Sequence, residues 1–464
     1  MKQLILTIVI LYTGTSLYAQ NTASFESAWE AVEHMRLGWG IGNTLDSHSG
    51  DTLRMWIESN KSRTVTSYET AWGQKVTQAS LFKLFKDAGF NAIRIPVTWY
   101  PHMEATFKDV RGYDNKGTWS YTPWFPSKDD IGTKIQAAWM ERVKQMVDYV
   151  IEQDMYCILN IHHDTGADNT AWLIADEKEY ATQRERFEAI WTQIAEEFRN
   201  YDEHLLFEGY NEMLDVKRSW CFASFAAQNH YDAAIARSAY NAINAYAQSF
   251  VDAVRATGGN NAQRNLIVST YGACNGAGNW NAHLLDPLKE MRLPNDPAGE
   301  GHLLFEVHSY PDVSNLDNAK NEILTNIGHL KEYLVKKGAP VIIGEWGTST
   351  QNAYEKKHDN LLAFSRFFVE QAKQAGMATF CWMGLSDGAH RTVPEFNQPD
   401  LVDAIAKGYY GEGGYADGIQ SASESTGRGF GKDNTCYDLS GRRTTNSTEQ
   451  SGLFINNGKI IIRK

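Results

Sequence analysis

The sequence contains few cysteines, and they form no recognisable metal or redox motif. There are five in 464 residues: Cys157, Cys221, Cys274, Cys381 and Cys436. Their number is odd, and their spacing differs from zinc-binding and redox-active patterns. The fold must therefore be held by its apolar core and not by a disulfide framework. One bridge between Cys221 and Cys274 stays open as an alternative, because exported chains often reach oxidising compartments.

Long apolar runs are also missing after the N-terminus. The first nineteen residues begin with Lys2, continue with the apolar stretch LILTIVILY and end in the small residue Ala19. This is the pattern of a secretory signal peptide. The stretch is too short for a comfortable membrane span, and no later segment comes close to one. We therefore expect no membrane span and an exported protein that is secreted, periplasmic or at the cell surface.

Positive charge is in deficit as well. The 44 Lys and Arg residues are outnumbered by 56 Asp and Glu, which gives a formal net charge of −12. Such a chain is poorly suited to a polyanionic partner, so we expect no nucleic acid among its partners. Apolar surface, in contrast, is abundant: 42% of the residues are hydrophobic, and 14 are tryptophans. The chain can bury a sizeable core, and some tryptophans can serve as platforms for flat apolar ligand faces.

Eight short apolar runs alternate with amphipathic helical stretches along the chain. The runs cover residues 37–41, 92–97, 156–161, 205–210, 266–270, 303–308, 341–344 and 378–383. Alternating strands and helices are typical of a parallel sheet, and eight such repeats predict an α/β fold of the (β/α)8 TIM barrel type. A doubly wound open sheet is less favoured, because GWGIGNT (38–44) lacks the glycine spacing of a phosphate loop before a helix.

The composition changes after about residue 411. Residues 411–434 are rich in Gly and Ser and predict a flexible linker. Residues 435–464 contain two strand-like pieces and an Asn-Asn-Gly turn, and they are too few to bury a core of their own. The predicted organisation is therefore a signal peptide (1–19), a barrel domain (20–410), this linker and a short β-type tail.

Polar residues gather where the predicted strands end, which is where the chemistry of such barrels takes place. Two of them are glutamates, Glu212 after the fourth strand and Glu345 after the seventh, whose ends can flank one small ligand. Hydrolysis of a glycosidic bond requires such a pair, one carboxyl group to protonate the leaving oxygen and one to attack or to activate water. The other candidate site residues are Asn43, His162, His163, Asn211, His308, Tyr310 and Trp382 at strand ends and Arg94 within its strand.

Other interpretations of these residues exist. A strand-end glutamate is often a salt-bridge partner, and Trp382 could belong to the core. His162, His163 and Asp164 could form a metal site, since histidine is a common ligand. Adjacent histidines on a strand point to opposite sides, however, so both cannot easily hold one ion. The joint occurrence of so many polar residues at strand ends favours hydrolysis without a metal or cofactor.

Several stretches carry a family resemblance: GFNAIRIPVTW, ILNIHHD, LLFEGYNEM, HSYP and IGEWG, in this order. Through them the chain resembles glycoside hydrolase family 5, a family of retaining β-glycanases, over roughly Leu37 to Tyr410. GWGIGNTLD and ETAWG are most similar to its endoglucanase and xyloglucanase members. The resemblance implies a TIM-barrel enzyme that hydrolyses a β-linked polysaccharide or oligosaccharide without a metal.

The resemblance also implies roles for the candidate residues. Glu212 would be the acid/base and Glu345 the nucleophile. Asn211 would hold the 2-hydroxyl of the sugar beside the cleaved bond, while Arg94 and Tyr310 would keep Glu345 ionised and oriented. Further contacts to the substrate or the carboxylates are expected from Asn43, His162, His163, His308 and, stacked under that sugar, Trp382.

The sequence departs from the family pattern at three places that affect the substrate, one of which is that Tyr310 is reached through HSYP. Met213 follows the acid/base, where family members often have proline, and the loop after the second strand is longer than expected. We expect an endo-β-1,4-glucanase (cellulase), with xyloglucanase, mixed-linkage glucanase and β-mannanase as alternatives. A non-catalytic carbohydrate-binding barrel is the alternative from another class, and the presence of both glutamates argues against it.

The C-terminal residues have a resemblance of their own. YDLSGRR and GLFINNGKIIIRK resemble the sorting tails of proteins exported by the type IX pathway, and a short accessory β-hairpin is the alternative. We expect the protein to be a monomer.

Overall fold

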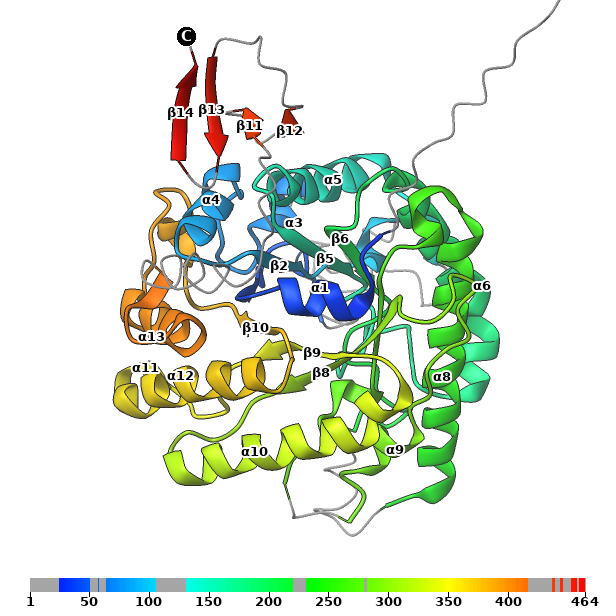
Figure 1. The fold of residues 1–464 in the computed structure, drawn as a ribbon. Helices are drawn as coiled ribbons and strands as arrows, with labels where there is room; N and C mark the ends of the chain where they lie inside the picture. The colour runs from blue at the N-terminus through cyan, green and yellow to red at the C-terminus, as the bar shows by residue number, and fades with distance from the viewer. Residues whose placement is uncertain are drawn as a thin grey trace, which may run out of the picture.

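Eight parallel strands close into a barrel in the computed structural model (Figure 1). The structure describes residues 25–50, 57, 64–105, 131–219, 231–278, 282–415, 436–438, 443–444, 452–456 and 459–463. Each of the eight predicted runs forms one strand, and the order around the barrel is β1-β10-β9-β8-β7-β6-β5-β2, which confirms the (β/α)8 prediction. The strands are β1 (Gly38–Gly40), β2 (Ala92–Ile95), β5 (Tyr156–Asn160), β6 (Leu205–Glu208), β7 (Leu266–Ser269), β8 (Leu303–Ser309), β9 (Val341–Trp346) and β10 (Thr379–Trp382).

Amphipathic helices connect the strands and cover the outside of the barrel (Figure 1). In α5, for example, Trp139, Val143, Met146 and Val150 recur at helical spacing and are buried. Several helices begin at a side-chain cap, as where Asp176 accepts from the first backbone N–H groups of α6. The long helices are α4 (Ala79–Asp87), α5 (Ala137–Ile151), α6 (Glu177–Glu197), α8 (Ala233–Ala256), α10 (Leu316–Tyr333), α12 (His358–Gln374) and α13 (Pro399–Tyr410), and the short ones are α3 (Val65–Glu69), α9 (Asp286–Glu290) and α11 (Ala353–Lys356).

A further short helix, α1 (Ala28–His34), closes the amino-terminal end of the barrel. It starts with a capping box in which Ser27 and Glu30 bond to each other's backbone N–H. Its apolar side joins a cluster of buried residues from seven strands, so this end of the interior is filled with hydrocarbon. The cluster comprises Ala28, Ala31, Val32, Met35, Ala92, Tyr156, Ile158, Leu206, Ile267, Leu304, Ile342, Ala378 and Phe380.

Two features of the chain path differ from the sequence prediction. β9 continues to Trp346, so Glu345 lies inside the strand and not just beyond it. The long loop after β2 begins and ends in an antiparallel pair, β3 (Met103–Ala105) and β4 (Ile131–Ile135), which no apolar run had indicated. The middle of this loop lies outside the described residues.

The cysteines and the apolar segments can be compared with their predictions. Cys274 is disulfide-bonded, whereas Cys157 and Cys381 are free and buried. Cys221, whose pairing with Cys274 the sequence left open, lies outside the described residues, as does the signal-peptide segment. Among the described residues, no helix has the length and apolar character needed to cross a membrane.

The C-terminal tail contains four short strands, β11 (Cys436–Asp438), β12 (Arg443–Thr444), β13 (Gly452–Asn456) and β14 (Lys459–Arg463). They form one antiparallel sheet in the order β12-β11-β13-β14. Asn456 pairs with Lys459 at the end of the β13–β14 ladder, as expected for a hairpin. The expected turn between them and residues 416–434 of the predicted linker lie outside the described residues.

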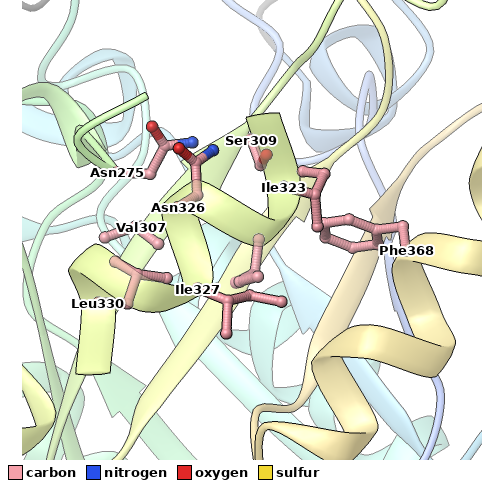
Figure 2. A pocket seen from close by; sticks show the side chains of 9 residues that line it. Asn275, Val307, Ser309, Ile323, Asn326, Ile327, Leu330 and Phe368 are labelled. Carbon is pink, nitrogen blue, oxygen red and sulfur yellow. The ribbon is translucent and has the colours of Figure 1, made fainter. Parts of the chain in front are cut away.

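A small cavity of about 10 Å³ lies between the barrel wall and α10 (Figure 2). Asn326 of α10 and Ser309 of β8 face the cavity. Their side-chain polar atoms are buried and have no hydrogen-bond partner among the described residues. A volume of this size is on the order of one water molecule. The cavity lies outside the barrel wall, so it is separate from the barrel interior.

We predict that truncation directly after Tyr415 leaves turnover and melting temperature nearly unchanged. Tyr415, the last described residue before the tail, still contacts the barrel: its ring lies 5.1 Å from that of Tyr410 and covers Gly89. Truncation after Gly411 removes Tyr415 as well and should lower the melting temperature by on the order of 1–2 °C. Thermal melts and turnover assays of both truncated proteins check this. A large drop in melting temperature or turnover in either protein would contradict the prediction.

Candidate active site

Arg94 lies at the centre of the barrel interior. Its neighbours Ile93 and Ile95 belong to the core outside the barrel, so strand alternation turns Arg94 inward. The guanidinium group is fully buried and donates from Nε and Nη2 to the two carboxylate oxygens of Glu208, at 2.6 and 2.7 Å. It also donates to Glu345 Oε1 and to Asn211 Oδ1, each at 2.7 Å. One side chain therefore ties together residues of β2, β6 and β9 and of the segment after β6.

The charge of Arg94 is maintained by these acceptors. Burial alone would lower its pKa, but Glu208, Glu345 and Glu306 raise the pKa well above its ordinary value. Glu208 in turn accepts a hydrogen bond from Asn160 Nδ2 at 2.9 Å. Arg94 is thus a permanent cation beneath the predicted nucleophile.

Glu212 and Glu345, the two predicted catalytic glutamates, lie close together with His308. One ligand atom from each of these three side chains falls within 4.8 Å of the other two. Glu345 is almost fully buried, whereas the Glu212 side chain is 19% exposed. The structure therefore brings both glutamates to one place at the carboxyl ends of the strands.

Glu345 is surrounded by donors. Arg94 donates to Oε1, and the Tyr310 hydroxyl donates to Oε2 at 2.5 Å. Burial together with the charge of Glu212 raises the pKa of Glu345 to about 7, although His308, Arg94 and Tyr310 act in the opposite direction. Arg94 and Tyr310 both contact this carboxylate and lower its pKa, but burial outweighs them, so the expectation that they keep Glu345 ionised is only partly met.

His308 lies between three carboxyl groups. Its Nδ1 is 2.7 Å from Glu212 Oε1 and 3.4 Å from Glu345 Oε2. Its Nε2 forms an ion pair of 2.6 Å with Glu306 Oε1, although the N–H does not point straight at the oxygen. Burial opposes the charged form, but Glu306, Glu345 and Glu212 raise the pKa of His308 well above its ordinary value. These three carboxyl groups therefore favour the imidazolium form of His308.

His162 and His163 lie side by side, which corrects the prediction that they point to opposite sides. β5 ends at Asn160, so strand alternation no longer applies to them. Their ring centroids are 4.4 Å apart, and both rings offer a nitrogen within 4.8 Å of an Asp46 oxygen. Burial lowers the pKa of both histidines well below the ordinary value, so both are neutral and can donate or accept hydrogen bonds.

Asp164 does not belong to this group, contrary to the metal-site alternative. Its carboxylate oxygens accept from the backbone N–H groups of Trp99 and Tyr100 and from the indole of Trp172. Asp164 therefore holds the backbone after β2, while Asp46 takes the place next to the histidines.

The tautomer of His162 follows from its neighbour Asn160. Nδ1 of His162 faces Asn160 Nδ2 at 3.1 Å and accepts from it, which leaves Nε2 as the donor.

Trp382 closes the site beside His162, with ring centroids 5.5 Å apart and planes 22° from parallel. Its indole lies against Gly40 and Gly42, where an added Cβ would come within 2.9 Å of the ring. Gly40 and Gly42 of GWGIG therefore make room for this tryptophan. Asn43 follows them at the end of β1 in the left-handed region (φ 58°), and its N–H donates to Asp46 at 3.0 Å.

Four residues of the site were not found from the sequence: Asp46, Asn160, Glu208 and Glu306. The two glutamates end the identical letters LLFE in β6 and β8, and both are fully buried. A carboxylate inside an apolar strand is costly unless it is paired, and this rule could have singled out both. No comparable signal marks Asp46 or Asn160.

The comparisons with known proteins agree with this geometry. The family model for cellulase (glycosyl hydrolase family 5) matches residues 56–387. Endoglucanase B of Neocallimastix patriciarum is 31% identical over 403 residues, covering 82% of this chain and 72% of that protein. Endoglucanase A of Clostridium longisporum is 27% identical, covering 83% of this chain and 67% of that protein.

Solved structures are similar as well. A GH5-4 broad specificity endoglucanase from an uncultured bacterium has 48% identity and a TM-score of 0.73, covering 84% of this chain and 97% of that one. A family 5 enzyme from Prevotella bryantii, solved in complex with a xyloglucan tetradecasaccharide, has 36% identity and a TM-score of 0.67. The alignment covers 83% of this chain and 99% of the Prevotella chain.

Proposed function

The chain belongs to glycosyl hydrolase family 5 and is a glycoside hydrolase, and we propose that it cleaves internal β-1,4 linkages of glucans by a retaining mechanism. Glu345 is the nucleophile and Glu212 the acid/base in this proposal. The observation that carries it is the close approach of Glu212, His308 and Glu345, whose ligand atoms lie within 4.8 Å of one another. Carboxyl groups of retaining pairs are about 5–5.5 Å apart, against about 6.5–9.5 Å in inverting pairs.

This spacing supports the proposed mechanism. A water would not fit between Glu345 and a bound sugar at a retaining distance, so in the proposal the carboxylate itself attacks the anomeric carbon and forms a glycosyl ester. Glu212 gives its proton to the departing glycosidic oxygen. In the second step Glu212, now a carboxylate, takes a proton from water, and the water oxygen displaces Glu345. Two displacements restore the β configuration.

The other site residues support binding of a sugar next to the cleaved bond. The amide oxygen of Asn211 accepts from Arg94, so its NH₂ end is available to donate to the 2-hydroxyl. The neutral rings of His162 and His163 offer further hydrogen-bonding atoms for hydroxyl groups. Trp382, which is half-buried, offers an apolar face under the same ring. Asn43 supports this site from the end of β1.

A broad glucan specificity that includes xyloglucan is the second candidate. It is favoured by the similarity to a broad specificity endoglucanase at 48% identity and to a xyloglucan-bound enzyme at 36% identity. We further propose that the substrate is met outside the cell, with residues 1–19 as a signal peptide and residues 435–464 as a segment for export, and that the protein acts as a monomer.

A hydrolysis screen tests the substrate. We expect the purified chain to release oligosaccharides of mixed length from carboxymethylcellulose, barley β-glucan and xyloglucan, with slower or no release from mannan and xylan. Product sizes distinguish endo from exo cleavage, and Glu345→Ala is the control for contaminating activity. A preference for mannan, or release of a single small product, would contradict the proposal.

The nucleophile is tested by Glu345→Ala. Activity should fall to almost nothing, and azide should restore part of it, giving an α-glycosyl azide from an activated β-glycoside. Proton NMR of the wild-type reaction should show the β-anomer first. The kcat/KM of the wild type should also fall on its acid side well above pH 4.5, because Glu345 has a pKa near 7 and a protonated carboxyl group cannot attack. An α-anomer appearing first would refute the assignment.

The acid/base is tested by Glu212→Gln, which keeps the shape and removes the proton. Hydrolysis of cello-oligosaccharides should drop by about 10²–10⁴-fold, the usual contribution of general acid catalysis. Aryl glycosides with good leaving groups need little protonation, so the formation of their glycosyl-enzyme should suffer much less. The presteady-state burst of the phenol measures this step, and equal losses for both substrate classes would contradict the role.

A further inference from the structure

We propose that Glu306 is a positioning residue that keeps His308 doubly protonated and thereby fixes the acidic proton of Glu212 on the oxygen that faces the substrate. The inference rests on the proposed role of Glu212 as acid/base. The new element is the buried carboxylate of Glu306. It does not touch the substrate, but the direction of proton transfer from Glu212 depends on it.

The barrel holds Glu306 firmly in place beneath His308. The two residues are separated by one position on β8, so both point into the interior. Glu306 is fully buried, and the hydroxyl of Ser269, its register neighbour on β7, donates to Oε2 at 2.5 Å. On the other side, a Cβ at Gly344 would lie 2.2 Å from Glu306 Oε1. Glycine at this position of β9 therefore leaves the space that the carboxylate occupies.

The contact with His308 is an ion pair. Glu306 Oε1 lies 2.6 Å from Nε2, on the opposite side of the ring from Glu212. Burial by itself would raise the pKa of Glu306, but the charge and contact of His308, followed by Arg94 and Ser269, bring that pKa below its ordinary value. Glu306 therefore stays ionised and serves as the counter-ion of the imidazolium.

The other groups that face His308 give the ring a fixed orientation. Nδ1 approaches Glu212 at 2.7 Å and Glu345 at 3.4 Å, and the ring of Tyr310 is perpendicular to it at 6.5 Å between centroids. From the segment after β7, Asn275 donates to the backbone carbonyl of His308 at 2.7 Å. Without Glu306, only the two catalytic carboxyl groups would favour the charged ring, and one of them carries a proton before the reaction.

Double protonation of His308 decides where the proton of Glu212 lies. An imidazolium has no free lone pair, so Nδ1–H can only donate, and Glu212 Oε1 must accept. The proton of the carboxylic acid is then on Oε2. A neutral ring could instead accept the Glu212 proton at Nδ1, which would turn this proton away from the glycosidic oxygen.

The test is the pH dependence of Glu306→Gln. The amide keeps the shape but removes the counter-ion, so the imidazolium form of His308 should persist only at lower pH. The basic limb of kcat/KM on cello-oligosaccharides should then move down by about one pH unit or more. The loss at pH 7 should be roughly tenfold or greater for cello-oligosaccharides and smaller for formation of the glycosyl-enzyme from an activated aryl glycoside.

Two further variants separate this role from a loss of stability. Glu69→Gln removes another buried carboxylate, which pairs with Arg142 at 2.7 Å outside the site. It should lower the melting temperature but leave the pH profile in place. Glu306→Asp retains the charge and should recover part of the wild-type basic limb. An unchanged profile in Glu306→Gln, or an equal shift in Glu69→Gln, would overturn the inference.

Nitrogen NMR of the histidine rings gives a readout that needs no turnover. At pH 7 the wild type should show an imidazolium signal that is absent in His308→Gln, and Glu306→Gln should convert this signal to that of a neutral ring. If the signal stays charged, the inference fails even when Glu212→Gln behaves as proposed. If Glu212→Gln shows no dependence on the leaving group, the acid/base assignment fails instead.

Discussion

A guanidinium group in the interior of a barrel costs several kcal/mol in lost hydration unless acceptors surround it. Arg94 is held there by Glu208, Glu345 and Asn211, with all four hydrogen bonds at 2.6–2.7 Å. Because the guanidinium group is planar and rigid, these acceptors are placed relative to one another by one side chain. The position of the predicted nucleophile in β9 thus depends on a pairing made with β2 and β6.

The charges around Arg94 explain the different states of the site carboxyl groups. Four carboxyl groups, those of Glu208, Glu212, Glu306 and Glu345, share two cations, Arg94 and His308. Full ionisation of all four would leave two uncompensated negative charges in a buried volume, which low-dielectric surroundings oppose. The raised pKa of Glu345 is one expression of this excess. The proposed retaining mechanism would use the same excess, because formation of the glycosyl ester removes one of the negative charges.

The barrel interior is apolar at the amino-terminal end of the strands and polar at their carboxyl end. At the amino-terminal end, residues such as Ile158, Leu206 and Ile267 pack with α1 and exclude water. At the carboxyl end, inward positions of the strands carry Asn160, Glu208 and other polar residues. The hydrocarbon layer gives the charged network a rigid base, so small changes in side-chain position are resisted by close packing.

Much of the fold could be predicted from the sequence, because burial repeats with a period. All eight strands were identified from apolar runs, since a strand covered on both faces is apolar throughout. Glu212 and Glu345 could be identified because a carboxylate at the end of such a run is unusual, and because the surrounding letters resemble a family. These inferences depend only on the residue types within short stretches, which the sequence gives directly.

The sequence by itself determined the barrel, the two glutamates and most of the polar residues around them. Only the tertiary structure decided which of these side chains meet. Arg94 and Glu345 are 251 residues apart in the chain, and Arg94 and Glu208 are 114 apart. His162 and His163 lie together because β5 stops before them, and Glu306 reaches His308 because Gly344 of the next strand leaves space. Closure of the barrel brings such residues within hydrogen-bonding distance, and local periodicity carries no information about that closure.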